Sequence, residues 1–314
     1  MSADEPLPAP PGRLHRLARA LPALALGTAL AGFALQLALR DRVPLLRTAF
    51  YALPWPLIAG LALVAGAAFA RRRAAAPAAS GLLLGCAALV LWLPGAIGPG
   101  PVPARPGAKV WTAALWNTYR TTNPVALHAL GAWDPDLVCV VEGPRERAAL
   151  ERAFPGRRVL ACRWGLGLVV RAGIAARGVR PVDLGDAGRA ARVELDLGGR
   201  SLLVVLVDLP SNPLRDRAPA FAALARELES SPGPALVLGD WNTPPASVHF
   251  QSLAERGLTD AFTAAGEGLR ETWPWPLPLL ALDQAWGRDL AFVRCQRRWR
   301  PVSDHRAVWV EWTF

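Results

Sequence analysis

Short polar and acidic side chains stand directly beside apolar runs at four places in this 314-residue chain. The runs have the composition of buried strands, and the polar side chains come at their ends. The residues concerned are Asn117, Glu142, Asp240, Asn242, Asp304 and His305. Since side chains at strand ends can point from a rigid scaffold into a cleft, we expect this set to converge on one site that holds a metal ion and a phosphate group.

Carboxylates dominate this set. The candidates are Glu142, Asp240 and Asp304, with Asp283 as a fourth. In one cleft their charges repel each other, and a hard divalent cation removes that penalty. Oxygen ligands suit Mg²⁺, Mn²⁺ or Ca²⁺ better than zinc. His305 follows Asp304 directly, so in an extended segment one side chain can bind metal while the other faces a reacting group. Such a site could activate water and neutralise an oxyanion, as phosphoester hydrolysis requires.

The motifs that carry these residues follow one another along residues 109–314. They are LWN with Asn117, VVEG with Glu142, LGDWN with Asp240 and Asn242, ALDQ with Asp283, and SDHRAV with Asp304 and His305. In order and approximate spacing they resemble the endonuclease/exonuclease/phosphatase (DNase I-like) family, in its membrane-anchored bacterial type. The resemblance implies an α/β fold, a four-layer sandwich in which two packed, mainly antiparallel sheets are flanked by helices.

The resemblance also implies a role for each matching residue. Glu142 is the principal ligand of Mg²⁺ (or Mn²⁺), assisted by Asp304 and Asn117. Asp240 positions or polarises the attacking water, and Asn242 holds a phosphate oxygen. His305 contacts the scissile phosphate or acts as the base, and Asp283 orients its imidazole.

Two positions depart from the family pattern. Where many members have a second histidine, this chain has Asp208, which either substitutes as an acid or caps a turn. Where membrane-attached members often have Asp-His, it has Asp283-Gln284. Because losing a general acid costs about 10²–10⁴ in rate, these departures leave open a catalytically impaired binding or sensing domain that retains the fold.

Apolar runs and helical patterns alternate beyond residue 108. We expect strands at 110–115, 137–141, 158–162, 166–171, 191–197, 201–207, 235–238, 290–293 and 307–310. Helical patterns cover 125–133, 145–154 and 218–230. Many strands with few interspersed helices favour two packed sheets flanked by helices.

The front of the chain is apolar. Three uncharged stretches predict transmembrane helices at about 20–39, 48–70 and 80–97, within a membrane region at 1–98. A cleaved signal peptide is the alternative for the first stretch, because Arg13, Arg16 and Arg19 precede it. Two further stretches and the lack of a clear cleavage site favour a membrane span instead. A Pro/Gly-rich linker at 99–108 then leads into the catalytic domain at 109–314.

The net charge of +10 is concentrated at this front. Residues 1–108 hold ten arginines against Asp4, Glu5 and Asp41, or +7, so residues 109–314 carry only +3. A nearly neutral domain makes tight nonspecific DNA binding less natural. The basic leader and the triplet Arg71-Arg72-Arg73 favour an extracytoplasmic position for the domain.

We therefore expect a membrane-tethered, divalent-metal-dependent phosphoester hydrolase of the phosphodiesterase, phosphatase or nuclease class, in which activated water attacks phosphorus in line. Its substrate is a lipid-derived, small-molecule or nucleic acid phosphoester. The N-terminal helices contact the lipid bilayer, which predicts a multi-pass protein of the cell membrane. No protein partner is implied.

Overall fold

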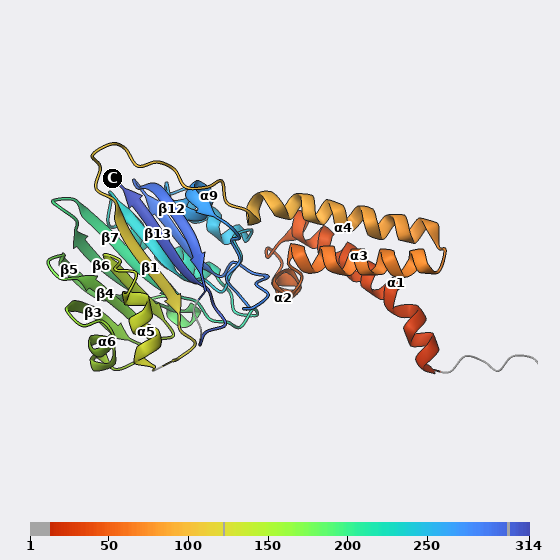
Figure 1. The fold of residues 1–314 in the computed structure, drawn as a ribbon, viewed down its shortest axis with the longest axis horizontal. Coiled ribbons are helices and arrows are strands. Elements are labelled where there is room, and N and C mark those ends of the chain that lie inside the picture. The colour runs from red at the N-terminus through yellow and green to blue at the C-terminus, as the bar shows by residue number, and fades with distance from the viewer. Residues whose placement is uncertain (1–12, 122, 300–301) are drawn as a thin grey trace, which may run out of the picture. The chain divides into compact units, whose positions relative to one another are not determined.

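The computed structural model of the chain describes residues 13–121, 123–299 and 302–314. It divides into two compact units (Figure 1). The first unit consists of the residues up to Leu39 together with Ala52–Trp92. The second consists of Arg40–Tyr51 and Leu93–Phe314. The segment between the first two apolar stretches thus belongs to the same unit as the predicted catalytic domain, although we expected it in the membrane region.

The first unit is built from long apolar helices. They are α1 (Arg13–Ala34), which continues as the π-helical η1 (Leu35–Leu39), α3 (Trp55–Arg71) and α4 (Ala75–Ala96). Small side chains let these helices approach closely: a Cβ atom on Gly81 would lie 2.7 Å from the Cα atom of Gly66. Ala29, Ala62 and Ala88 are fully buried in the same cluster. Such contacts are typical of helices that pack in an apolar surrounding.

Two helices are long and apolar enough to cross a membrane, namely Ala20–Leu39 and Ala75–Ala96. These correspond to the first and third predicted spans. The predicted span at 48–70 is instead divided into α2 (Arg47–Ala52) and α3, and Pro44–Ala52 is bent by 68° from Trp55–Arg71. The described part of the chain therefore has two candidate spans, or three if this bent pair counts as one.

Two sheets form the second unit. The seven-stranded sheet has the order β10-β12-β13-β1-β2-β4-β3, and the six-stranded sheet has the order β5-β6-β7-β8-β11-β9. The strands of the first are β1 (Trp111–Asn117), β2 (Leu137–Val141), β3 (Arg157–Arg163), β4 (Leu166–Arg171), β10 (Gly266–Glu267), β12 (Ala291–Arg298) and β13 (Ala307–Thr313). Those of the second are β5 (Ala175–Val182), β6 (Arg189–Asp196), β7 (Ser201–Asp208), β8 (Ala235–Asp240), β9 (Thr259–Asp260) and β11 (Asp283–Arg288).

The layers follow from three apolar clusters. The largest lies between the two sheets and contains Leu115, Leu206 and Leu238. On the outer face of the seven-stranded sheet, α5 (Pro124–Gly131) and α6 (Arg147–Ala153) bury Leu127 and Leu150 (Figure 1). On the outer face of the six-stranded sheet, the main helix is α7 (Ala218–Glu229). The expected four-layer sandwich is confirmed, and most strand pairs are antiparallel, the parallel ones being β1 with β2, β7 with β8 and β10 with β12.

The segment 40–51 is fastened to the second unit by a buried carboxylate. The side chain of Asp41 accepts hydrogen bonds from the Ser247 hydroxyl, from the Val248 backbone N–H at 3.0 Å and from the Tyr51 hydroxyl at 3.1 Å. Ser247 caps the short helix η4 (Val248–Phe250). Buried polar groups need hydrogen-bond partners, and the Asp41 carboxylate is the acceptor for three such donors.

Two arginines extend this attachment to the loops after β7 and β8. Arg47, which is buried, donates to the Arg215 carbonyl at 3.0 Å and to the Asp216 carboxylate at 3.1 Å. Arg217, fully buried, donates to the carbonyls of Pro210 and Asn242 at 2.6 and 3.3 Å. These loops follow Asp208 and Asp240, so the attachment supports the backbone beside two of the predicted site residues.

We predict that Asp41→Ala destabilises the second unit. The substitution leaves buried donors without partners, and each such group costs about 1–3 kcal/mol. The free energy of unfolding of the full chain in detergent, followed by tryptophan fluorescence in denaturant, should fall by about 2–4 kcal/mol. Glu255→Ala, which removes an exposed carboxylate, serves as the control. Equal unfolding of the two variants would contradict the attachment.

Candidate active site

The predicted site residues continue the inner faces of the core strands. Side chains along a strand alternate between its two faces. On β8, Leu236 and Leu238 lie in the core between the sheets, and Asp240 is the next residue on that face. On β7, Leu206 is likewise followed by Asp208. On each of these strands, the face that packs into the core therefore ends in a carboxylate.

Strand register brings these carboxylates side by side. Asp240 pairs with Asp208 on parallel β7 and with Asp283 on antiparallel β11. In the opposite sheet, Asn117 ends β1 and pairs with Val141, so that Glu142 follows directly on the neighbouring strand. Residues in register on adjacent strands lie within about 5.5 Å of each other. The site is thus built from two facing rows of side chains, one per sheet.

The two rows meet at Asp240. Ligand atoms of Glu142, Asp208 and Asp240 lie within 4.8 Å of one another, and so do those of Asp240, Asp283 and His305. Asn117 joins the rows, because its amide Nδ2 lies 2.8 Å from the Asp240 carboxylate and 3.5 Å from that of Glu142. We name the set Glu142, Asp208, Asp240, Asp283 and His305 the acidic cluster.

Burial and mutual repulsion shift the protonation of this cluster. Desolvation, and then repulsion by Asp240 and Glu142, raise the pKa of Asp208 to about 8. Desolvation, and then repulsion by Asp283, raise the pKa of Asp240 to about 6. Burial is thus the main cause of both shifts, and the repulsion expected from clustered carboxylates adds to it.

The His305 side chain is held by Asp283. Its Nδ1 lies 2.7 Å from the Asp283 carboxylate, and both side chains are buried. Burial alone would lower the pKa of His305, but attraction to Asp283, its hydrogen bond and the charge of Asp240 outweigh burial and raise the pKa to about 10. The imidazole is therefore oriented by Asp283 and stays cationic at neutral pH. The Ser303 hydroxyl accepts from the His305 backbone N–H and donates to the Asn117 carbonyl, which joins this segment to the end of β1.

Asp304 lies outside both ligand groups found among the described residues. One carboxylate oxygen accepts a hydrogen bond of 2.8 Å from the Trp273 indole, while the other is buried and has no partner among the described residues. The loop that carries Trp273 thus positions an acid next to His305. Its free oxygen is available to a ligand.

Glu142 and Asn242 adopt backbone conformations that side chains rarely take. Their φ angles are +48° and +44°. At Asn242, the backbone N–H donates to Asp240 at 2.9 Å and the side-chain amide donates to the Leu209 carbonyl at 2.8 Å. Strain of this kind is typical of functional sites. Gly239 is required for a different reason, since a Cβ atom there would lie 1.9 Å from the Val207 carbonyl oxygen.

Gln284 does not face the acidic cluster. Strand alternation places it on the opposite side of β11 from Asp283. Its amide nitrogen donates to the carbonyls of Thr243 and Ala281, and its oxygen accepts from the Trp286 indole. Gln284 is therefore a satisfied residue of the outer core, and the departure from the family pattern leaves no gap at the site.

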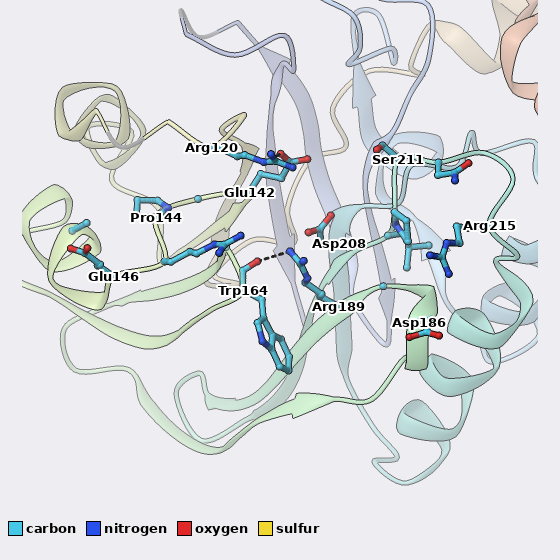
Figure 2. A pocket seen from close by; sticks show the side chains of 18 of the residues that line it. Arg120, Glu142, Pro144, Glu146, Trp164, Asp186, Arg189, Asp208, Ser211 and Arg215 are labelled. Carbon is cyan, nitrogen blue, oxygen red and sulfur yellow. Dashed lines mark hydrogen bonds and ion pairs between the residues drawn. The ribbon is translucent and has the colours of Figure 1, made fainter.

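A pocket with a volume of about 1090 Å³ adjoins the cluster and is lined by Glu142 and Asp208 (Figure 2). Two further lining residues were missed by sequence reasoning. Arg120 lies 3.3 Å from the Glu142 carboxylate, and Arg189 on β6 pairs in register with Asp208 on β7. Extending the predicted hairpin of 191–197 and 201–207 by two residues would have placed Arg189 opposite Asp208.

The residues fit a hard divalent cation. The acidic cluster offers carboxylate oxygens, which Mg²⁺ and Mn²⁺ prefer, and no described cysteine belongs to it. The oxygen Oδ1 of Asp283 is buried and lacks a partner among the described residues. Asn117 presents its donor nitrogen to the carboxylates, while its oxygen accepts from the Tyr119 backbone N–H at 2.9 Å. In this arrangement its amide nitrogen holds the carboxylates together, and its predicted role as a metal ligand stays a prediction.

Known structures share this fold. A mannosyl-6-phosphatase of Bacteroides thetaiotaomicron is 15% identical, with a TM-score of 0.56 over 65% of this chain and 100% of that one. An endonuclease/exonuclease/phosphatase family protein of the same organism is 15% identical, with a TM-score of 0.54 over 66% and 98%. A humanized TDP2 of D. rerio is 13% identical, with a TM-score of 0.51 over 65% and 99%. These likenesses concern the fold.

Comparison by sequence gives the family directly. No curated protein matches the chain. A sequence model of the endonuclease/exonuclease/phosphatase family matches residues 114–305, which is more than half of the chain and spans every predicted site residue. The protein is therefore a member of the endonuclease/exonuclease/phosphatase family.

Proposed function

We propose that the protein is a divalent-metal-dependent phosphoester hydrolase. The observation that carries the proposal is the acidic cluster, in which the carboxylates of Glu142, Asp208 and Asp240 lie together and the His305 imidazole lies beside Asp240 and Asp283. Family membership supports it, since relatives of the same fold include a mannosyl-6-phosphatase and a TDP2 solved with a single-strand DNA product. The common chemistry of these relatives is the cleavage of a phosphoester.

In this proposal each residue has one task. Glu142, Asp208 and Asp240 would hold Mg²⁺ or Mn²⁺. Asp304, which the family resemblance implies as a further ligand, lies outside this group and keeps one buried oxygen without a partner among the described residues. When bound, the metal neutralises phosphate charge and lowers the pKa of bound water.

The remaining side chains act on the phosphate. His305, kept cationic and oriented by Asp283, donates from Nε2 to a phosphate oxygen and stabilises the charge that develops there. Asn117 holds the carboxylates of Asp240 and Glu142 in place. Asn242 offers its side-chain oxygen to the substrate, because its amide nitrogen already donates to the Leu209 carbonyl.

Two observations favour the active enzyme over the catalytically impaired alternative. Gln284 lies on the far side of β11, and Asp208 belongs to a ligand group instead of standing alone in a turn. We therefore favour the active enzyme.

We further propose that the protein is tethered to a membrane by three spans. Residues 40–51 and 93–314 belong to one compact unit, so they lie on the same side of any membrane that Ala20–Leu39 and Ala75–Ala96 cross. The chain then has to return between them through α3. This places Arg71, Arg72 and Arg73 on the opposite side, where the positive-inside rule favours the cytoplasm, and the catalytic unit outside it.

The first test is loss of activity. We predict that His305→Ala lowers the rate of hydrolysis of bis(4-nitrophenyl) phosphate or 4-nitrophenyl phosphate by about 10²–10³, the usual contribution of a donor that stabilises charge in the transition state. Asp240→Asn should reduce the rate at least as much, and chelation with EDTA should abolish it. His128→Ala, a histidine on α5 away from the cluster, is the matched control. If neither substrate is cleaved with Mg²⁺ or Mn²⁺, the hydrolase proposal is wrong.

The second test is a change in pH dependence. Asp283→Asn removes the charge that holds the pKa of His305 near 10, so burial then lowers that pKa. The cationic imidazole is the active form, and activity is lost as pH rises through its pKa. The alkaline limb of the kcat profile should therefore move to lower pH in the variant. An unchanged limb would show that His305 does not act as a cation.

The third test concerns stability without metal. The pKa of Asp208 is raised from 3.8 to about 8, so between these values the folded protein holds a proton that the unfolded chain releases. Stability from this group is therefore lost as pH rises from about 4 to 8. In EDTA, Asp208→Asn should show a smaller fall in thermal stability over this range than the unsubstituted protein. Equal slopes would contradict the shift.

A further inference from the structure

The pocket beside the acidic cluster is rich in arginine. Of its 20 lining residues, five are arginines: Arg120, Arg145, Arg152, Arg189 and Arg215. This is one residue in four, whereas Lys and Arg together make up 35 of the 314 residues in the chain. The catalytic domain as a whole carries only +3. Five of the 25 basic residues at 109–314 thus line the pocket that adjoins the cluster.

These arginines converge from separate segments of the fold. Arg120 follows β1, Arg145 precedes α6, Arg189 begins β6 and Arg215 stands in the loop between β7 and α7. Figure 2 shows Arg120, Arg189 and Arg215 placed around the pocket that Glu142 and Asp208 line. The backbone of Arg215 is held by the buried side chain of Arg47 at 3.0 Å.

Most of these guanidinium groups are not engaged in hydrogen bonds or ion pairs with the described residues. Arg120 pairs with Glu142, and Arg189 donates to the Trp164 carbonyl at 3.0 Å. For the side chains of Arg145, Arg152 and Arg215, the described residues provide no hydrogen bond or ion pair.

Four acids line the same pocket, and two of them, Glu142 and Asp208, belong to the acidic cluster. The acidic lining residues outside the cluster are Glu146 and Asp186. Since guanidinium groups bind phosphate and carboxylate through paired N–H donors, the pocket offers an anion site in addition to the cluster.

One anionic group would not use both sites. In the proposed function, the acidic cluster with its metal takes the scissile phosphate, which leaves the arginines for another group. A long polyanion would also need a basic track over the rest of the domain, and the net charge of +3 argues against one. We propose that the pocket binds a second anionic group of a compact substrate, so that the enzyme selects phosphoesters that carry a further phosphate or a carboxylate. This inference rests on the proposed function for its scissile site.

The experiment compares matched substrates in the full chain in detergent. Phosphate release is measured with Mg²⁺ from fructose 6-phosphate and fructose 1,6-bisphosphate, and nitrophenol release from thymidine 5′-(4-nitrophenyl phosphate) with and without a 3′-phosphate. The kcat/KM should be about tenfold or more higher for the member with two anionic groups, which corresponds to about 1.4 kcal/mol. Phosphatidylglycerol phosphate in phosphatidylcholine vesicles, compared with its deacylated headgroup, distinguishes a lipid source from a soluble one.

Pocket variants identify the residues. Arg152→Gln and Arg215→Gln, alone and together, should lower kcat/KM more for the doubly anionic member of each pair than for the singly anionic member. Arg177→Gln, an exposed arginine on β5 outside the pocket, is the control and should leave the ratio unchanged. A salt titration should reduce the ratio in the unsubstituted protein more than in the double variant.

The outcomes separate the two proposals. Turnover of bis(4-nitrophenyl) phosphate or 4-nitrophenyl phosphate with equal kcat/KM within each matched pair overturns the second-anion site and leaves the hydrolase standing. Preference for single-stranded DNA over both compact pairs also overturns it, in favour of a nuclease. If no substrate is cleaved, calorimetric binding of fructose 1,6-bisphosphate and fructose 6-phosphate to the same protein decides: tighter binding of the bisphosphate, lost in the double variant, supports the site, and equal binding overturns it.

Discussion

Repulsion among buried carboxylates is the constraint around which this site is organised. Asp240 is fully buried and stands in register between Asp208 and Asp283. The protein relieves part of this repulsion itself, through the amide of Asn117 and the imidazolium of His305. Burial, and then the remaining repulsion, raise the pKa of Asp208 and of Asp240, so the site without metal binds protons where a cation would remove the cost. Metal affinity and instability without metal therefore have one physical origin.

The site residues lie on the same strand faces as the apolar residues of the core, at the next position along each face. On β1, β7 and β8, the residues that face the opposite sheet are apolar until the last one, which is Asn117, Asp208 or Asp240. A shift of register by one residue would turn each of these side chains away from the cleft. Burial of the apolar residues thus fixes the geometry of the polar ones. The crowding at Gly239, where no Cβ fits against Val207, shows how closely β7 and β8 approach at this end.

Sequence reasoning found those parts of the site whose signal is local. Asp240, Asn242 and His305 adjoin apolar runs or sit in short motifs, and the four-layer fold followed from the same pattern and the family resemblance. It placed no strand at β11, because Trp286, Gly287 and Arg288 do not alternate in polarity, although Asp283 begins it. The attachment of 40–51 could not be foreseen, since Asp41 meets Ser247 and Val248 more than 200 positions later. Contacts between residues so far apart in the chain produce no periodic pattern in the sequence.

Average charge describes the domain as a whole but not the neighbourhood of the site. A sum of +3 over residues 109–314 suggested a domain without a strong field, yet its acids and arginines are sorted in space. Carboxylates gather at the strand ends, and arginines from four loops and helix ends gather beside them. Arg120 pairs with Glu142, whereas Asp240 is buried at the end of β8 and has no arginine partner among the described residues. The five arginines of the pocket are exposed. The acidic cluster would bind a cation, and the arginines would bind an anion. Together they suit a phosphate ester that is bound through a metal.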